Sequence, residues 1–183
     1  MLNTFVVYVE NKPGVLTRVA SLFRRRAFNI DSLTVGRTEK PQVSRMTITV
    51  DADRDQARRI EANLYKLVNV LLVENITTAP AIIRDLAMIK VAATHEARSH
   101  VLELASVFRA RVVDVAPESL IIEITGGEDK IDGLLEVLRP YGVLEMVRTG
   151  IVAMLRGNKP SAQLSSPEAA TQAITDDDLS QSV

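Results

Sequence analysis

The sequence of 183 residues contains no cysteine and no tryptophan, and it has only four phenylalanines and three tyrosines. Without cysteine, the chain cannot form a disulfide scaffold, a thiol nucleophile or a thiolate metal site. The absence of cysteine is also compatible with a reducing compartment, and we expect the protein to be cytoplasmic. Few aromatic side chains leave little material for stacking on nucleic-acid bases.

A strong charge of either sign and a long apolar run are also missing. The formal net charge is −1, from 22 basic and 23 acidic residues, so the overall balance attracts neither nucleic acid nor anionic lipid. The first residues, MLNTFVVYVE, lack the basic start and the cleavage site of a signal peptide. No later segment approaches the length of a membrane span. We therefore expect no nucleic-acid partner and no membrane partner.

Patterns that would support catalysis or metal binding are absent as well. The two histidines, His95 and His100, are five positions apart and do not share a helix face as a metal pair would. No glycine-rich phosphate loop, nucleophile elbow or Ser/His/Asp set can be assembled. The pair Gly126-Gly127 indicates a turn before a helix. We expect no catalytic residue and no metal site.

Hydrophobic periodicity predicts the order strand, helix, strand, strand, helix, strand, and then the same order again. In the first unit the predicted strands are 2–9, 30–36, 43–50 and 68–76, and the predicted helices are 14–26 and 53–66. In the second unit the predicted strands are 83–94, 111–116, 119–125 and 143–155, and the predicted helices are 97–109 and 131–138. The predicted fold class is α+β, with two ferredoxin-like βαββαβ modules whose antiparallel sheets carry helices on one face.

A local echo supports duplication of one module, because Ala20–Arg24 (ASLFR) and Ala105–Arg109 (ASVFR) occupy matching places in the first helix of each unit. The predicted domains are 1–77 and 83–157, joined by a linker at 78–82. Each module has about 75 residues, a size at which a single core is marginal, so we expect at least a homodimer. Residues 158–183 have few large apolar side chains, and we expect a disordered tail.

The turn Asn11-Lys12-Pro13-Gly14 joins the first strand to the first helix. Proline presets φ for a first helical turn, and glycine lets a ligand approach the free backbone amides of Gly14, Val15 and Leu16. A carboxylate there would gain hydrogen bonds and the favourable end of the helix dipole. The Asn11 side chain could accept from an ammonium group. The local pattern alone favours a capped strand-to-helix turn with no ligand.

The basic run Arg24-Arg25-Arg26 admits a second interpretation, because a βαββαβ sheet is also the scaffold of a common RNA-binding module. That module stacks bases on aromatic side chains of its central strands. Strands 30–36 and 43–50 contain no aromatic residue. The three arginines are better explained as charges that complement the dipole at the end of a helix.

Several segments together resemble one known family. They are VENKPGVLTRVASLFRRRAFNIDSLTVG, VSRMTITV, LYKLVNVLLV, LAMIKV, FRARVVDVAPESLIIEITG and RTGIVAMLRG. In this order they are similar to the regulatory small subunit of acetolactate synthase, also called acetohydroxyacid synthase, over nearly all of residues 2–157. The resemblance implies an ACT domain followed by an ACT-like ferredoxin domain, in a subunit with no activity of its own.

The same resemblance implies a partner and an effector. The partner is the large catalytic subunit, which uses thiamine diphosphate, magnesium and FAD to condense pyruvate with pyruvate or 2-oxobutyrate in branched-chain amino-acid biosynthesis. The small subunit raises that activity and confers feedback inhibition, typically by valine. No cofactor is expected on this chain itself.

The resemblance also assigns a valine site at the interface of two ACT domains. The residues that it implies are Asn11, Gly14, Val15 and Leu16 from one protomer and Asn29 and Ile30 from its neighbour. An apolar pocket for the isopropyl group would be lined by Val15, Leu16, Ile30 and Leu33.

Ala27 departs from the family, which often has glycine there, so this residue must adopt a strained left-handed conformation or the helix must end differently. Two other functions stay open on the sequence. One is a free-standing ACT-type amino-acid sensor that regulates another partner. The other is an unrecognised enzyme on a ferredoxin-like fold.

Overall fold

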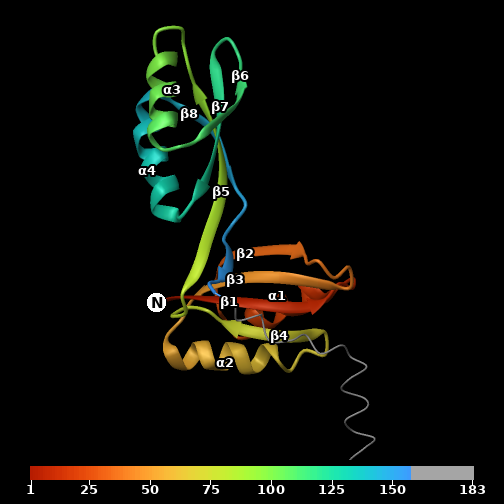
Figure 1. Ribbon diagram of the computed structural model, residues 1–183. Helices are drawn as coiled ribbons and strands as arrows, with labels where there is room; N and C mark the ends of the chain where they lie inside the picture. Colours follow the sequence, from red (N-terminus) through yellow and green to blue (C-terminus); the bar gives the residue numbers. More distant parts are fainter. Residues whose placement is uncertain (158–183) are drawn as a thin grey trace, which may run out of the picture.

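The computed structural model describes residues 1–157, which form two modules joined by a long strand (Figure 1). Strands of the first module are β1 (Leu2–Glu10), β2 (Ile30–Arg37), β3 (Val43–Asp51) and β4 (Val70–Asn75), and its helices are α1 (Val15–Arg25) and α2 (Arg54–Leu64). The sheet order is β2-β3-β1-β4, and the pairings are antiparallel. The predicted tail at 158–183 lies outside the described residues.

The second module repeats this arrangement. Its strands are β5 (Ala81–Ala92), β6 (Arg111–Val115), β7 (Ser119–Gly126), β8 (Val143–Arg148) and β9 (Val152–Leu155), and its helices are α3 (Arg98–Val107), α4 (Glu128–Leu138) and the short 3₁₀ turn Arg139–Tyr141. The sheet order is β6-β7-β5-β8, with β9 paired to the start of β5. The α+β prediction of two ferredoxin-like βαββαβ modules is confirmed.

Alternation along each central strand places one face of each sheet against its helices. In the first module, Phe5, Val7 and Val9 of β1 are buried with apolar side chains of α1 and α2. In the second module, Ile89 of β5 and Ile122 of β7 are buried with α3 and α4. The two helix layers therefore enclose separate cores, as the sequence periodicity predicted.

The prediction of a single strand at 143–155 is wrong, because this segment forms two strands, β8 and β9, separated by residues 149–151. Gly150 has φ +86, a left-handed conformation that interrupts the strand. The two resulting strands pair with different parts of β5: Arg148 lies opposite Ala87, whereas Val152 lies opposite Arg84. β5 starts at Ala81, two residues before the predicted start, and spans the distance between the modules (Figure 1).

The sequence echo between the first helices does not hold as a structural equivalence. α1 and α3 both end in a Schellman motif, with Ala27 and Arg109 in the left-handed region at φ 56 and φ 52. Relative to these helix ends, the ASLFR segment lies three residues earlier than ASVFR does. The modules share their fold and the conformation at the end of the first helix. The similar segments ASLFR and ASVFR, however, occupy positions that differ by nearly one helical turn.

The face of the first sheet that points away from its helices is covered by the chain itself. The buried apolar side chains on this face include Val6, Tyr8 and Val43, and Ile76 packs with them. Ala153 of β9 covers them. The guanidinium of Arg45 lies 5.7 Å from the Tyr8 ring and also donates to the Ala153 carbonyl. Strand β9 therefore pairs with β5, a strand of the second module, and packs against the sheet of the first module.

The conformation of Ala27 predicts a stabilising substitution. Ala27→Gly should raise the free energy of unfolding by about 1 kcal/mol, because glycine carries no left-handed penalty. The matched control, Ala20→Gly in the interior of α1, should lower it by about 1 kcal/mol. Urea denaturation of the three proteins measures both changes, and a loss of stability in both variants would contradict the strained helix end.

Candidate functional site

The turn between β1 and α1 presents backbone donors to open space. Gly14 caps α1 with φ 80, and a Cβ placed on it would meet no atom within 4 Å. Within residues 1–157, the N–H groups of Gly14 and Leu16 have no hydrogen-bond partner, and the N–H of Val15 makes only a long bond of 3.4 Å to the Lys12 carbonyl. These donors at a helix N-terminus can receive a carboxylate.

Polar side chains from four segments hold this turn in place. Glu10, at the end of β1, accepts from Lys12 at 3.0 Å and from the Asn69 side chain. Asn69 in turn accepts from Arg18 of α1 at 2.6 Å. The Asn69 hydrogen bond, followed by the contact with Lys12, lowers the pKa of the Glu10 carboxyl below its ordinary value. The network was not predicted, because Asn69 is distant in sequence and carries no motif.

The Asn11 side chain is oriented by the hairpin that follows β2. Its Nδ2 donates to the Pro41 carbonyl at 3.0 Å, and its backbone N–H donates to the Gln42 carbonyl at 2.7 Å. With Nδ2 engaged, the Oδ1 atom is the group left to accept from a ligand. This geometry suits the predicted contact with an ammonium group.

Asn29 and Ile30 lie at the opposite end of α1. Asn29 is exposed, and its side chain has no hydrogen-bond partner within the described part of the chain. The 11 residues of α1 separate it from Gly14 by about 16 Å. Within one chain, the six predicted residues therefore form two groups: Asn11, Gly14, Val15 and Leu16 at one end, and Asn29 and Ile30 at the other.

The predicted apolar lining is only partly accessible. Val15 is 4% exposed and packs into the core of the first module, so its side chain does not face a ligand. Leu16 is 44% exposed. Ile30 and Leu33 are half-buried at the edge of the same core. Three of the four residues can therefore present a surface to an aliphatic group.

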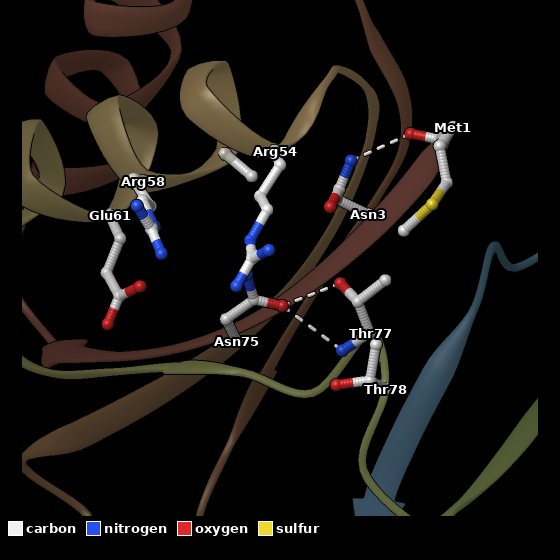
Figure 2. A pocket seen from close by; sticks show the side chains of 9 residues that line it. Met1, Asn3, Arg54, Arg58, Glu61, Asn75, Thr77 and Thr78 are labelled. Atoms are coloured by element: carbon white, nitrogen blue, oxygen red, sulfur yellow. Dashed lines mark hydrogen bonds between the residues drawn. The ribbon is translucent and has the colours of Figure 1, made fainter.

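A separate cavity lies between α2 and the end of β4, where no residue was predicted (Figure 2). It measures about 560 Å³ and is lined by Met1, Asn3, Arg54, Ala57, Arg58, Glu61, Asn75, Thr77 and Thr78. Figure 2 shows Arg54 reaching toward Asn75 while Arg58 lies beside Glu61. Most of its lining residues are polar or charged. The cavity lies beside α2, whereas the Gly14 turn lies at the start of α1.

Residues 1–157 contain neither a metal-binding cluster nor a membrane-spanning helix. No group of three or more His, Asp or Glu side chains is placed to hold a metal ion. Among the helices of this part of the chain, none has the length and apolar character needed to cross a bilayer.

Comparison with known families gives two matches that follow one another along the chain. Residues 5–72 match the model described as the AHAS small subunit-like ACT domain. Residues 84–157 match the model of the small subunit of acetolactate synthase. The chain belongs to the acetolactate synthase small-subunit family. The predicted resemblance is confirmed, and each matched region corresponds to one of the two modules.

Relatives within the acetolactate synthase small-subunit family span nearly the same length. An Archaeoglobus fulgidus protein named "Probable acetolactate synthase small subunit" is 51% identical over 159 residues, which cover 87% of this chain and 99% of that protein. The acetolactate synthase small subunit of Mycobacterium bovis is 48% identical over 155 residues, covering 85% and 92%. The crystal structure of the acetolactate synthase small subunit from Thermotoga maritima superposes with a TM-score of 0.82 at 42% identity, covering 86% of this chain and 99% of that one.

The lowered pKa of Glu10 predicts a pH-dependent stability. A depressed pKa means that ionised Glu10 stabilises the fold above the unfolded-state pKa of about 4.3, and that this stabilisation disappears as the pH falls through the folded-state value. Glu10→Gln should therefore lower the melting temperature at about pH 7, and its difference from the wild type should shrink as the pH falls below about 4.3.

Thermal denaturation across this range tests the effect. Glu39→Gln, in the exposed hairpin and without an ion pair in residues 1–157, is the matched control and should show no such pH dependence. A constant difference between Glu10→Gln and the wild type at every pH would contradict the assignment.

Proposed function

We propose that this protein is a non-catalytic regulatory subunit of the transferase acetolactate synthase. It activates the catalytic large subunit and confers feedback inhibition by valine in the biosynthesis of valine, leucine and isoleucine. The observation that carries the proposal is the family membership across both modules. The open donor turn at Gly14 in the ACT module supports the effector part.

The separation of the six predicted residues supports a site shared between two copies of the chain. Helix α1 connects β1 to β2 and so lies over β3, beside the edge strand β2. A two-fold axis through paired β2 edges would set two α1 helices side by side in opposite directions. The Gly14 end of one helix would then lie beside the Asn29 end of the other. A homodimer through the ACT domains is the assembly that completes the site.

The chemistry of the two ends fits a small amino acid. The amides of Gly14 and Leu16 would bind the carboxylate, and the amide oxygens of Asn11 and Asn29 would accept from the ammonium group. Leu16, Ile30 and Leu33 would surround the isopropyl group. An extra methylene changes binding by only about 1–3 kcal/mol, so leucine and isoleucine should bind more weakly and still measurably.

Catalysis belongs, in this proposal, to the large subunit, which would carry thiamine diphosphate, magnesium and FAD. The complex would be cytoplasmic. Valine, by holding two ACT modules together, would favour an arrangement of the dimer in which the catalytic subunit is less active. A coupling of about 1–3 kcal/mol between two such sites is typical.

Valine binding is tested by the melting temperature of the purified chain. At about 100 times its dissociation constant, valine should add about 2.7 kcal/mol of stability and raise the melting temperature by several degrees. Gly14→Asp should abolish the shift, since a carboxylate would repel that of the ligand. Gly14→Asn is the matched control. Asparagine has the shape of aspartate and tolerates positive φ but carries no charge, so this variant should retain more of the shift than Gly14→Asp does.

Asn29→His tests the other half of the site and should also remove the shift. An unchanged response to valine in both Gly14→Asp and Asn29→His would refute the site assignment.

The partner is tested by reconstitution. Adding the chain to a purified acetolactate synthase catalytic subunit should raise its rate of pyruvate condensation, and valine should then inhibit the complex, whereas the chain alone should show no turnover. Capture from native extract should recover a large thiamine-dependent enzyme. Recovery of a different partner, with no stimulation of the catalytic subunit, would favour a free-standing amino-acid sensor.

A further inference from the structure

The segment between β8 and β9 crosses the first module at β2. The Ile151 N–H donates to the Ser32 hydroxyl at 3.1 Å. The Thr34 hydroxyl donates to the Thr149 carbonyl at 3.3 Å. Two side chains on one face of β2 therefore hold the backbone on both sides of Gly150. We call residues 149–151 the crossing segment.

Gly150 allows the crossing segment to lie this close. Its φ of +86 is a left-handed conformation, and a Cβ added to it would lie 2.8 Å from the Ser32 hydroxyl oxygen and 2.9 Å from that of Thr34. Both distances are shorter than real Cβ atoms show. With any larger residue at this position, the two hydroxyls or the crossing segment must shift, so the contact as it stands depends on glycine.

The same segment is tied to the second module. The Thr149 hydroxyl donates to Asp85 Oδ1 at 3.0 Å and accepts from the Leu86 N–H at 3.2 Å. Asp85 is 7% exposed and lies 3.6 Å from Nε of Arg148. Arg148 also donates to Asp132 of α4 at 2.5 Å. Hydrogen bonds and the ion pair between Asp85 and Arg148 thus connect β2 to α4.

The start of β2 belongs to the proposed effector site. Ile30 pairs with Val50 and Ser32 pairs with Thr49, so Asp31 is an extra residue at a bulge between them. A bulge is a point at which a strand can bend. A ligand that repositions Asn29 and Ile30 would therefore act on β2 next to this bulge, and the residue on the other side of the bulge, Ser32, contacts the crossing segment.

Space for a shift exists at this point. A polar cavity of about 420 Å³ adjoins the crossing segment, and its other lining residues include Asp31, Ser32, Asp85, Glu128 and Arg148. It lies between the modules, so the crossing segment can move without displacing either apolar core. Movement there would change the surroundings of Arg148 and of the first turn of α4.

We propose that Ser32, Thr34 and the crossing segment 149–151 are the relay through which occupancy of the Asn29 end of the effector site reaches α4 in the second module. The relay rests on the proposed function, because it needs an effector at that site. Ser32 and Thr34 act here as positioning residues: they hold the crossing segment and need not contact the effector.

The test is hydrogen–deuterium exchange of the full chain with and without valine, in wild type and in Ser32→Ala/Thr34→Val. In wild type, valine should slow exchange both in residues 11–17 at the site and in residues 128–138 of α4. The double variant should keep the slowing at 11–17. At 128–138, the factor by which valine slows exchange should fall by at least about fivefold, the lower limit of typical couplings. Thr78→Val removes an exposed hydroxyl in the turn after β4, away from the crossing segment and from α4, and should behave as wild type.

Three results would overturn the relay. The first is slowing at 128–138 that persists in the double variant, and the second is slowing at 11–17 in wild type without any at 128–138. The third is no response anywhere in wild type, including the melting temperature, which would refute the proposed valine site and the relay with it.

Gly150→Ala provides a second variant that keeps both hydroxyls and whose Cβ disturbs their contact with the crossing segment. It should also lose the slowing at 128–138 while keeping that at 11–17. Retention of both would show that the close contact of the crossing segment with β2 carries no signal.

Discussion

The structure depends on burial of the second face of the first sheet. A βαββαβ module covers one face of its sheet with helices and leaves the other open, and here the open face carries Val6, Tyr8 and Val43. The chain covers these side chains with β9, the last strand of the described residues. Because β9 pairs with β5, which continues into the second sheet, this hydrophobic contact joins the modules far more firmly than a flexible linker would.

The two modules differ in this respect although they share an order of elements. On the second sheet, Met88 and Val147 lie opposite each other on the face away from the helices, and they are 41% and 51% exposed. The described part of the chain does not cover them. The face of the first sheet that points away from its helices is therefore covered within the chain, while the corresponding face of the second sheet keeps exposed apolar side chains. Under the proposed function, effector binding and the exposed apolar face would therefore lie on different modules.

Local patterns predicted much of the fold and part of the site. The helices follow from apolar residues at helical spacing, and the hairpin of β2 and β3 follows from alternation around a turn. Gly14 was recognisable because a glycine after proline at a helix start has a specific conformational use. The conformation of Ala27 was open, since a Schellman motif normally contains glycine; the packing of Phe28 and Ile30 against the core accompanies the left-handed turn.

The sequence by itself determined the module order, the helix faces and the turn that presents free amides, because period and turn chemistry are encoded by neighbouring residues. Only the tertiary structure decided that strand 143–155 breaks at Gly150, that Glu10 meets Asn69 across 59 positions, and that the crossing segment rests on Ser32. These contacts arise between distant segments. They are selected by the burial of whole sheet faces, which no local pattern of residues specifies.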